Sequence, residues 1–270
     1  MIPHWVLYLI GGFLTGSINS IAGGGALLLF PLLISAGVPA IMANTTMSLA
    51  VLPGSISSAY GYRERLKKLP KHYFFLLVPC FFGSLIGAVI LLDTSGHIFR
   101  IVAPLFMVAA VCLLIFQPAI HKRLYNRKAL NGHRFSMECL VSVVFFVLSM
   151  YGGYFGAGFG IIVLSLLALT RIKDIQQMNG LKNCIGISVG IADSGYFVHR
   201  NVVDWHVLPF LVIGGLTGGY LASTYGSKLP AAKLRVAIIL MAVVVTGYLG
   251  YKFYWGDVSQ AEAVIKKMVY

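Results

Sequence analysis

The chain has 270 residues, of which 58% are hydrophobic and only 11% are charged, and its formal net charge is +13. Soluble domains average about 25% charged residues, so this composition excludes an ordinary soluble enzyme or binding domain and indicates a polytopic membrane protein. The basic residues lie mainly between apolar stretches, where lysine and arginine set membrane orientation and meet anionic headgroups. We therefore expect a lipid bilayer, and no nucleic acid, as the partner of this positive charge.

Eight apolar segments follow one another along the chain. A helix needs about 20 apolar residues to cross the hydrocarbon layer, and by that measure the segments lie at residues 5–35, 41–62, 72–92, 98–118, 137–170, 175–198, 206–225 and 232–255. They make two sets of four, which predicts an all-α fold with two transmembrane repeats. The repeats comprise residues 1–118 and 137–256, joined by a basic cytoplasmic linker at 119–136 and followed by a tail at 257–270.

The first segment of each set is too long for one upright crossing and too short for two. Each contains a glycine cluster, Gly23-Gly24-Gly25 in the first and Gly156-Ala157-Gly158-Phe159-Gly160 in the second. One glycine destabilises a helix by about 1 kcal/mol relative to alanine, so each cluster predicts a break. Irregular backbone at membrane depth survives only inside protein or beside a wet cavity. We interpret both segments as discontinuous, with two half-helices forming a re-entrant hairpin.

The two halves of the chain also resemble each other at an offset of 135 residues. Matching glycine, asparagine and arginine residues at one offset are unusual for two unrelated apolar stretches, and they indicate a duplication. The matched pairs include Gly23 with Gly158, Gly25 with Gly160, Asn44 with Asn179, Gly83 with Gly218 and Arg100 with Arg235. Duplicated apolar halves with glycine-interrupted segments at matching positions are typical of secondary transporters and mark the binding site.

The placement of charge favours an inverted arrangement of the repeats. Basic residues crowd residues 63–71 and the central linker, whereas the loop at 93–96 is nearly neutral. The two basic loops should therefore face the cytoplasm. In the second half the positive charge shifts to the loops after the broken segment and after 206–225. Re-entrant first segments would invert the repeats, whereas first segments that cross fully would make them parallel.

The glycine clusters are the first candidate binding residues. The N-terminus of a half-helix presents unpaired N–H groups and the positive end of the helix dipole, and glycine allows a ligand to approach the backbone. Gly23, Gly24, Gly25, Gly158 and Gly160 are thus predicted to bind a small anion. Wider glycine spacings, Gly12-xxx-Gly16 and Gly83-xxx-Gly87, instead predict close helix packing.

Polar residues in the segment after each break are the second candidates. Asn44, Thr45 and Asn179 could donate hydrogen bonds to an oxyanion, and asparagine recurs at the same place in both halves. Interhelical hydrogen bonding is the alternative role for such side chains.

Lys182 and Asp193 are ionisable residues within a single apolar segment. Charged residues inside a span are costly and are functional candidates by default. Eleven residues separate them, about 16 Å along a helix axis, so they cannot pair directly. Lys182 could help to hold an anion, and Asp193 could carry a coupling proton, unless it lies close enough to the end of the span to reach interfacial water.

No catalytic arrangement stands out. The sequence lacks HExxH and nucleotide-loop motifs, so we expect neither an enzyme, nor a cofactor, nor ATP dependence. The four cysteines, Cys80, Cys112, Cys139 and Cys184, lie in apolar runs without a CxxC pair, and we expect no metal site.

The run from Ile21 to Leu33, IAGGGALLLFPLL, resembles the glycine-rich signature of the sulfite exporter TauE/SafE family. Residues 43–48 resemble that family's small-Thr-Ser stretch, and residues 156–160 are similar to its second half. The resemblance covers most of residues 5–250. It implies a duplicated, multi-pass permease of the inner (plasma) membrane that moves sulfite, sulfonates, thiosulfate or related small organic anions.

Together these features predict a permease that moves a small anion by alternating access, with the site between the two glycine breaks. Two other classes remain open: a passive anion channel or facilitator with the same architecture, and a non-transporting integral membrane protein. The sequence makes no prediction about oligomeric state.

Overall fold

The computed structural model describes residues 3–125, 134–168, 170, 172, 174–226 and six residues between 239 and 247. Within these ranges the chain is helical and contains no strand. The helices are α1 (His4–Ile21), α2 (Ala26–Ser35), α3 (Ala40–Gly61), α4 (Arg63–Leu66), the 3-10 helix η1 (Lys71–Leu76), α5 (Leu77–Asp93), α6 (Gly96–Tyr125), α7 (Arg134–Tyr154), α8 (Phe159–Leu167), α9 (Ile175–His199) and α10 (Leu208–Tyr225).

The surface of this fold is apolar where lipid would meet it. Two stretches of the described helices, Lys71–Asp93 and Gly96–Phe116, are long and apolar enough by themselves to cross a membrane. Phe75, Phe82 and Leu105 are more than half exposed on them. Large apolar patches of this kind are rare on soluble monomers, so the exposed faces of α5 and α6 suit contact with hydrocarbon.

Both long first segments are interrupted at their glycine clusters. α1 ends at Ile21 and α2 begins at Ala26, while α7 ends at Tyr154 and α8 begins at Phe159. α2 folds back along α1. Gly25 lies against the backbone of Thr15, and a Cβ added to Gly11 would be 2.9 Å from the Leu32 side chain. At ten residues, α2 is about 15 Å long, half of the hydrocarbon thickness.

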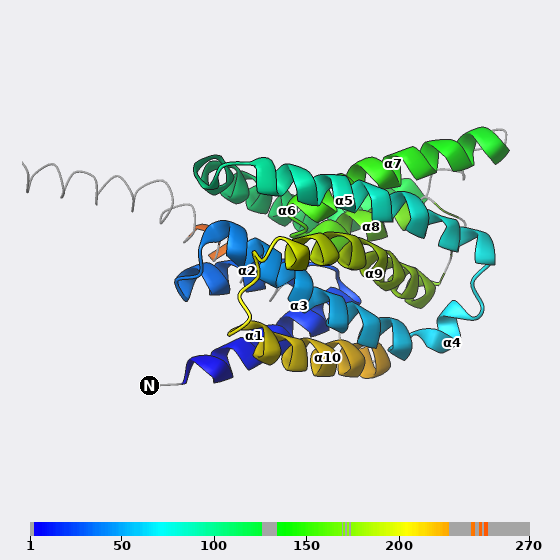
Figure 1. Ribbon diagram of the computed structural model, residues 1–270. Coiled ribbons are helices and arrows are strands. Elements are labelled where there is room, and N and C mark those ends of the chain that lie inside the picture. Colours follow the sequence, from blue (N-terminus) through cyan, green and yellow to red (C-terminus); the bar gives the residue numbers. More distant parts are fainter. Residues whose placement is uncertain are drawn as a thin grey trace, which may run out of the picture.

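The helices pack as two bundles (Figure 1). The first bundle contains α1, α3 and α10, and the second contains α5, α7 and α9. Each bundle therefore combines helices from both halves of the chain. The seam between the bundles is the contact of α3 with α9, which run antiparallel: Ser48 contacts Asp193 and Ser55 faces Gly186.

Glycines bring the helix backbones of each bundle into contact. Gly12 and Gly16 of α1 lie directly against the backbone of Leu211 and Gly215 in α10, with no room for a methyl group. In the second bundle, Gly83 and Gly87 of α5 lie in the same way against Phe146 and Met150 of α7. The close packing predicted for these two spacings is confirmed.

The first basic loop, residues 63–71, lies beside the start of α9. α4 follows α3 there, and Arg65 of α4 forms an ion pair of 3.4 Å with Asp174, whose side chain also accepts a hydrogen bond from the Gln176 N–H and caps α9. Helices α6 and α7 extend into the predicted linker, of which residues 126–133 lie outside the described residues. The predicted tail and most of the eighth segment also lie outside them.

Candidate functional site

The two helix breaks meet in the middle of the molecule. Gly23 lies directly against the backbone of Gly160: a Cβ added to Gly160 would be 2.6 Å from the Gly23 Cα. Gly23 adopts a φ of +84°, a conformation that favours glycine. The unwound stretch at Gly23 and the first turn of α8, more than 130 residues apart, therefore share one contact, which requires glycine on both sides.

Each break leaves backbone donors free. Within the described residues, no hydrogen bond engages the N–H groups of Gly24, Gly25 and Ala26 in the first break, or those of Ala157, Gly158 and Gly160 in the second. They belong to the first turns of α2 and α8, where the helix dipole is positive. Buried N–H groups without a partner are rare in proteins, so these six donors suit an anionic ligand.

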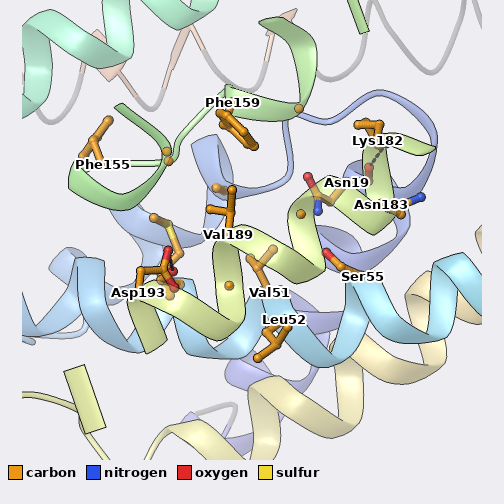
Figure 2. Close-up of a pocket in the computed structure, with 18 residues that line it drawn as sticks. Asn19, Val51, Leu52, Ser55, Phe155, Phe159, Lys182, Asn183, Val189 and Asp193 are labelled. Atoms are coloured by element: carbon orange, nitrogen blue, oxygen red, sulfur yellow. Dashed lines mark hydrogen bonds between the residues drawn. The ribbon is translucent and has the colours of Figure 1, made fainter. Parts of the chain in front are cut away.

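A cavity of about 70 Å³ lies beside the breaks, between α3 and α9 (Figure 2). A cavity needs at least about 10–15 Å³ of this kind of volume to hold one water, so the space suits several waters or one small anion. Its polar lining residues are Asn19, Ser48, Ser55, Lys182, Asn183 and Asp193, and its apolar wall includes Phe155 and Phe159. On α9, Gly186 and Gly190 line the cavity between Lys182 and Asp193, and their lack of side chains leaves room there.

Lys182 lies at one end of this cavity and is 3% exposed. Its Nζ donates to the carbonyl oxygen of Ser20 at 2.8 Å and to that of Asn19, both in the last turn of α1. In the described part of the chain it has no acidic partner. When protonated, this buried amine is bound only to neutral carbonyls of the described residues and keeps its positive charge, so this end of the cavity would attract anions.

Asp193 lies at the other end and is 1% exposed (Figure 2). Its carboxyl group accepts hydrogen bonds from Ser48 at 2.9 Å and from Ser194 at 3.1 Å. None of the described basic residues forms an ion pair with it. At about 16 Å along α9 and an effective dielectric constant of about 20, Lys182 would stabilise its charge by only about 1 kcal/mol.

Three predicted ligands do not line the cavity. Asn44 Nδ2 donates to the carbonyl of Tyr154 at 3.0 Å, and Thr45 Oγ1 contacts the carbonyl oxygens of Met42 and Val202. The Asn44 side chain therefore contacts backbone at the end of α7, and the Thr45 side chain contacts backbone in the loop before α10. Asn179 is buried near Asn183, which donates to its carbonyl at 2.9 Å.

The residues that are structurally equivalent in the two breaks are not those paired by the sequence offset of 135. Gly156 has a φ of +70° and follows the end of α7 as Gly23 follows the end of α1, an offset of 133 residues rather than 135. Gly158 is the N-cap of α8, with a φ of +79°, and Gly160 lies inside that helix. Of the predicted glycines, only Gly160 lines the cavity, and Gly23, Gly24, Gly25 and Gly158 lie in the adjoining breaks.

Several cavity residues carried only a weak sequence signal. Asn19 is a polar residue near a glycine cluster, and Ser55 carries a buried hydroxyl that finds no hydrogen-bond partner among the described residues. Phe155 and Phe159 flank the second break and could have been recognised only from their position. Across the described ranges, no group of three or more His, Cys, Asp or Glu side chains is placed to hold a metal ion.

Comparison with known proteins identifies the family. The sequence pattern of the family described as "Sulfite exporter TauE/SafE" matches residues 8–249. A "Probable membrane transporter protein" of Haemophilus influenzae is 26% identical over 246 residues, which cover 90% of this chain and 93% of that protein. The "Probable membrane transporter protein YfcA" of Escherichia coli K12 is 25% identical over 260 residues, covering 94% of this chain and 91% of the relative.

A third relative, the "Probable membrane transporter protein ORF9" of Sinorhizobium sp, is 22% identical over 89% of this chain and 90% of its own length. No solved structure matches the chain. The family pattern covers almost all of the helical region in which the two breaks and the cavity lie. The chain therefore belongs to the sulfite exporter TauE/SafE family and is an integral membrane protein of the transporter type.

Proposed function

We propose that this protein is a secondary permease that moves a small anion, such as sulfite, a sulfonate or a related sulfur-containing anion, by alternating access. The observation that carries the proposal is the meeting of two glycine breaks beside a cavity that contains a lysine without an acidic partner among the described residues. Gly23 contacts Gly160, and Lys182 lies within the same buried region. The names of the relatives describe transporters and no enzymatic activity.

The anion would bind between the first turns of α2 and α8 and the Lys182 ammonium. Ala26 and Gly160 line the cavity, and their N–H groups, without a partner among the described residues, supply donors that carry no charge of their own; those of Gly24, Gly25 and Gly158 lie in the adjoining breaks. An oxyanion there gains charge-assisted hydrogen bonds, which are about twice as strong as neutral ones. The cavity volume favours an anion of a few heavy atoms without a long organic tail.

We infer that the two halves of the chain are inverted repeats. α1 runs parallel to α10, since Gly12 faces Leu211 and Gly16 faces Gly215. α3 also runs parallel to α10, since Gly54 faces Gly215 and Gly61 faces Ser223. α7 runs parallel to α5, and α9 runs antiparallel to α3. α1 and α7 therefore enter from opposite ends, as inversion requires, and relative movement of the two bundles would open the cavity to each side in turn.

The orientation follows from the basic end of the molecule. Lys and Arg of residues 63–71 lie with Asp174 at the end where α3 finishes and α9 begins. By the positive-inside rule this end faces the cytoplasm, and a bacterial chain of this kind would reside in the inner membrane. The N-terminus then lies on the opposite side.

Asp193 is our candidate for proton coupling. Its buried carboxyl group has hydroxyl donors but no basic partner among the described residues. A proton removes the negative charge that would otherwise repel an anion in the same cavity. Binding of the anion and binding of the proton would thus favour each other, which is the requirement for symport.

The test is transport by the purified protein in liposomes. Sulfite, thiosulfate, a short alkyl sulfonate and chloride are first screened for thermal stabilisation, because a specific ligand raises the melting temperature by mass action. The stabilising anion should then show saturable uptake and counterflow. A channel shows no trans-stimulation, so uptake without counterflow would favour the passive facilitator, and no uptake of any stabilising anion would contradict the proposal.

A further inference from the structure

The broken ends of α1 and α7 are both held by side chains from the opposite bundle. Lys182 of α9 donates to Ser20 and Asn19 in the last turn of α1, and Asn44 of α3 donates to Tyr154 at the end of α7. Asn183 adds a longer bond of 3.5 Å to Ser20. The three donor side chains are at most 3% exposed.

These contacts satisfy the groups that each break exposes. The last four carbonyls of a helix have no partner within the helix, and they cannot turn to water at this depth. The C-terminus is also the negative end of the helix dipole, where a cation is stabilising. Lys182 and Asn44 therefore stabilise the unwound stretches of the partner bundle, and each must lose its bond if the bundles separate there.

The two links differ in charge and in access to the cavity. Asn44 is always neutral and does not line the cavity, whereas Lys182 can carry a positive charge and does line it. A lysine ammonium carries three N–H donors, and two hydrogen bonds go to α1. An anion in the cavity competes with the carbonyls of Asn19 and Ser20 for this ammonium, and its full charge makes it the stronger acceptor.

We propose that Lys182 is a positioning residue that holds the end of α1 against α9 until an anion in the cavity draws its ammonium away. The release by an anion rests on the proposed function, whereas the hydrogen bonds from Lys182 to the end of α1 do not. Release would loosen the α1 break, where only the longer Asn183 bond remains, and not the α7 break, because Asn44 still holds α7. The anion would thereby weaken one of the contacts across the seam between the bundles and permit their relative movement.

Hydrogen exchange of the full-length protein in lipid nanodiscs tests the link without any substrate. Lys182→Gln should speed exchange about 5- to 30-fold in peptides covering residues 17–28 and leave residues 150–162 unchanged. Asn44→Ala should show the reverse pattern, and Lys182→Arg should restore most of the protection. Equal exchange at residues 17–28 in Lys182→Gln and the wild type would overturn the proposal.

The trigger is tested by adding sodium sulfite, with sodium chloride as the control. Sulfite should speed exchange at residues 17–28 in the wild type and cause no further change in Lys182→Gln. If sulfite stabilises the protein but protects residues 17–28, the release is refuted and the proposed function stands. If sulfite neither stabilises the protein nor alters exchange in any peptide, sulfite transport and its release of Lys182 are both refuted.

Discussion

Replacing Gly23 by alanine should destabilise the protein strongly, because two separate costs add at this position. Its φ of +84° costs a residue with a side chain about 1–2 kcal/mol. The added methyl group would also strike the backbone of Gly160 and the Ile161 nitrogen, the latter at 2.7 Å. Backbone cannot rotate away, and overpacking of this kind typically costs about 1–3 kcal/mol. The sum is about 2–5 kcal/mol.

Two alanine substitutions separate these contributions. Gly37 has a φ of +89° with nothing within 4 Å of an added Cβ, so Gly37→Ala should cost only the 1–2 kcal/mol of backbone strain. At Gly24 the nearest atom is the flexible Ile161 Cδ1 at 3.2 Å, so Gly24→Ala should cost under about 1 kcal/mol. When free energies of unfolding are measured in mixed micelles, the loss of stability should be smallest for Gly24→Ala, larger for Gly37→Ala and largest for Gly23→Ala. A Gly23→Ala loss no larger than that of Gly37→Ala would refute the contact between the breaks.

Three further predictions concern coupling, selectivity and the surface. Asp193→Asn should abolish accumulation driven by a pH gradient in proteoliposomes while counterflow continues; equal retention of both would exclude this carboxyl as the proton carrier. Phe159→Leu replaces an aromatic side chain of the cavity wall by a smaller one, so the cavity becomes larger, and uptake of a longer alkyl sulfonate should rise severalfold relative to sulfite. An unchanged uptake ratio would argue against this cavity as the site. Arg65→Ala removes an exposed ion pair with Asp174 and should lower stability by at most about 1 kcal/mol; a larger loss in micelle unfolding would show that the pair does more than join two loops.

The helix breaks were predictable because glycine acts locally. A run such as Gly23-Gly24-Gly25 weakens a helix whatever surrounds it, and the length of the apolar segment showed that one upright crossing could not contain it. The meeting of the breaks required the additional idea of a duplication. The register of the second break was misplaced by two residues, because glycine occurs at three of its five positions and identity alone could not select Gly156.

The partners of the polar side chains were not predictable from spacing. Asn44 and Thr45 have the chemistry of anion ligands, but each bonds to a distant carbonyl group, 110 and 157 residues away, and Thr45 bonds also to the nearby Met42 carbonyl. A donor inside a membrane bonds to whichever acceptor the fold brings near, and sequence distance carries no information about that. Lys182 was recognisable as an outlier because a buried charge is costly anywhere, even though its bonds to α1 were not.

The interleaving of the two bundles has a consequence for how this protein can be divided. α10 lies with α1 and α3, and α5 lies with α7 and α9, so each half of the chain lacks a helix that its own neighbours require. Two fragments separated within residues 126–133 should each be unstable when produced alone, yet co-produced fragments should recover a working permease by exchanging α5 and α10. Assembly of the membrane-embedded molecule would therefore wait until the second half has been synthesised.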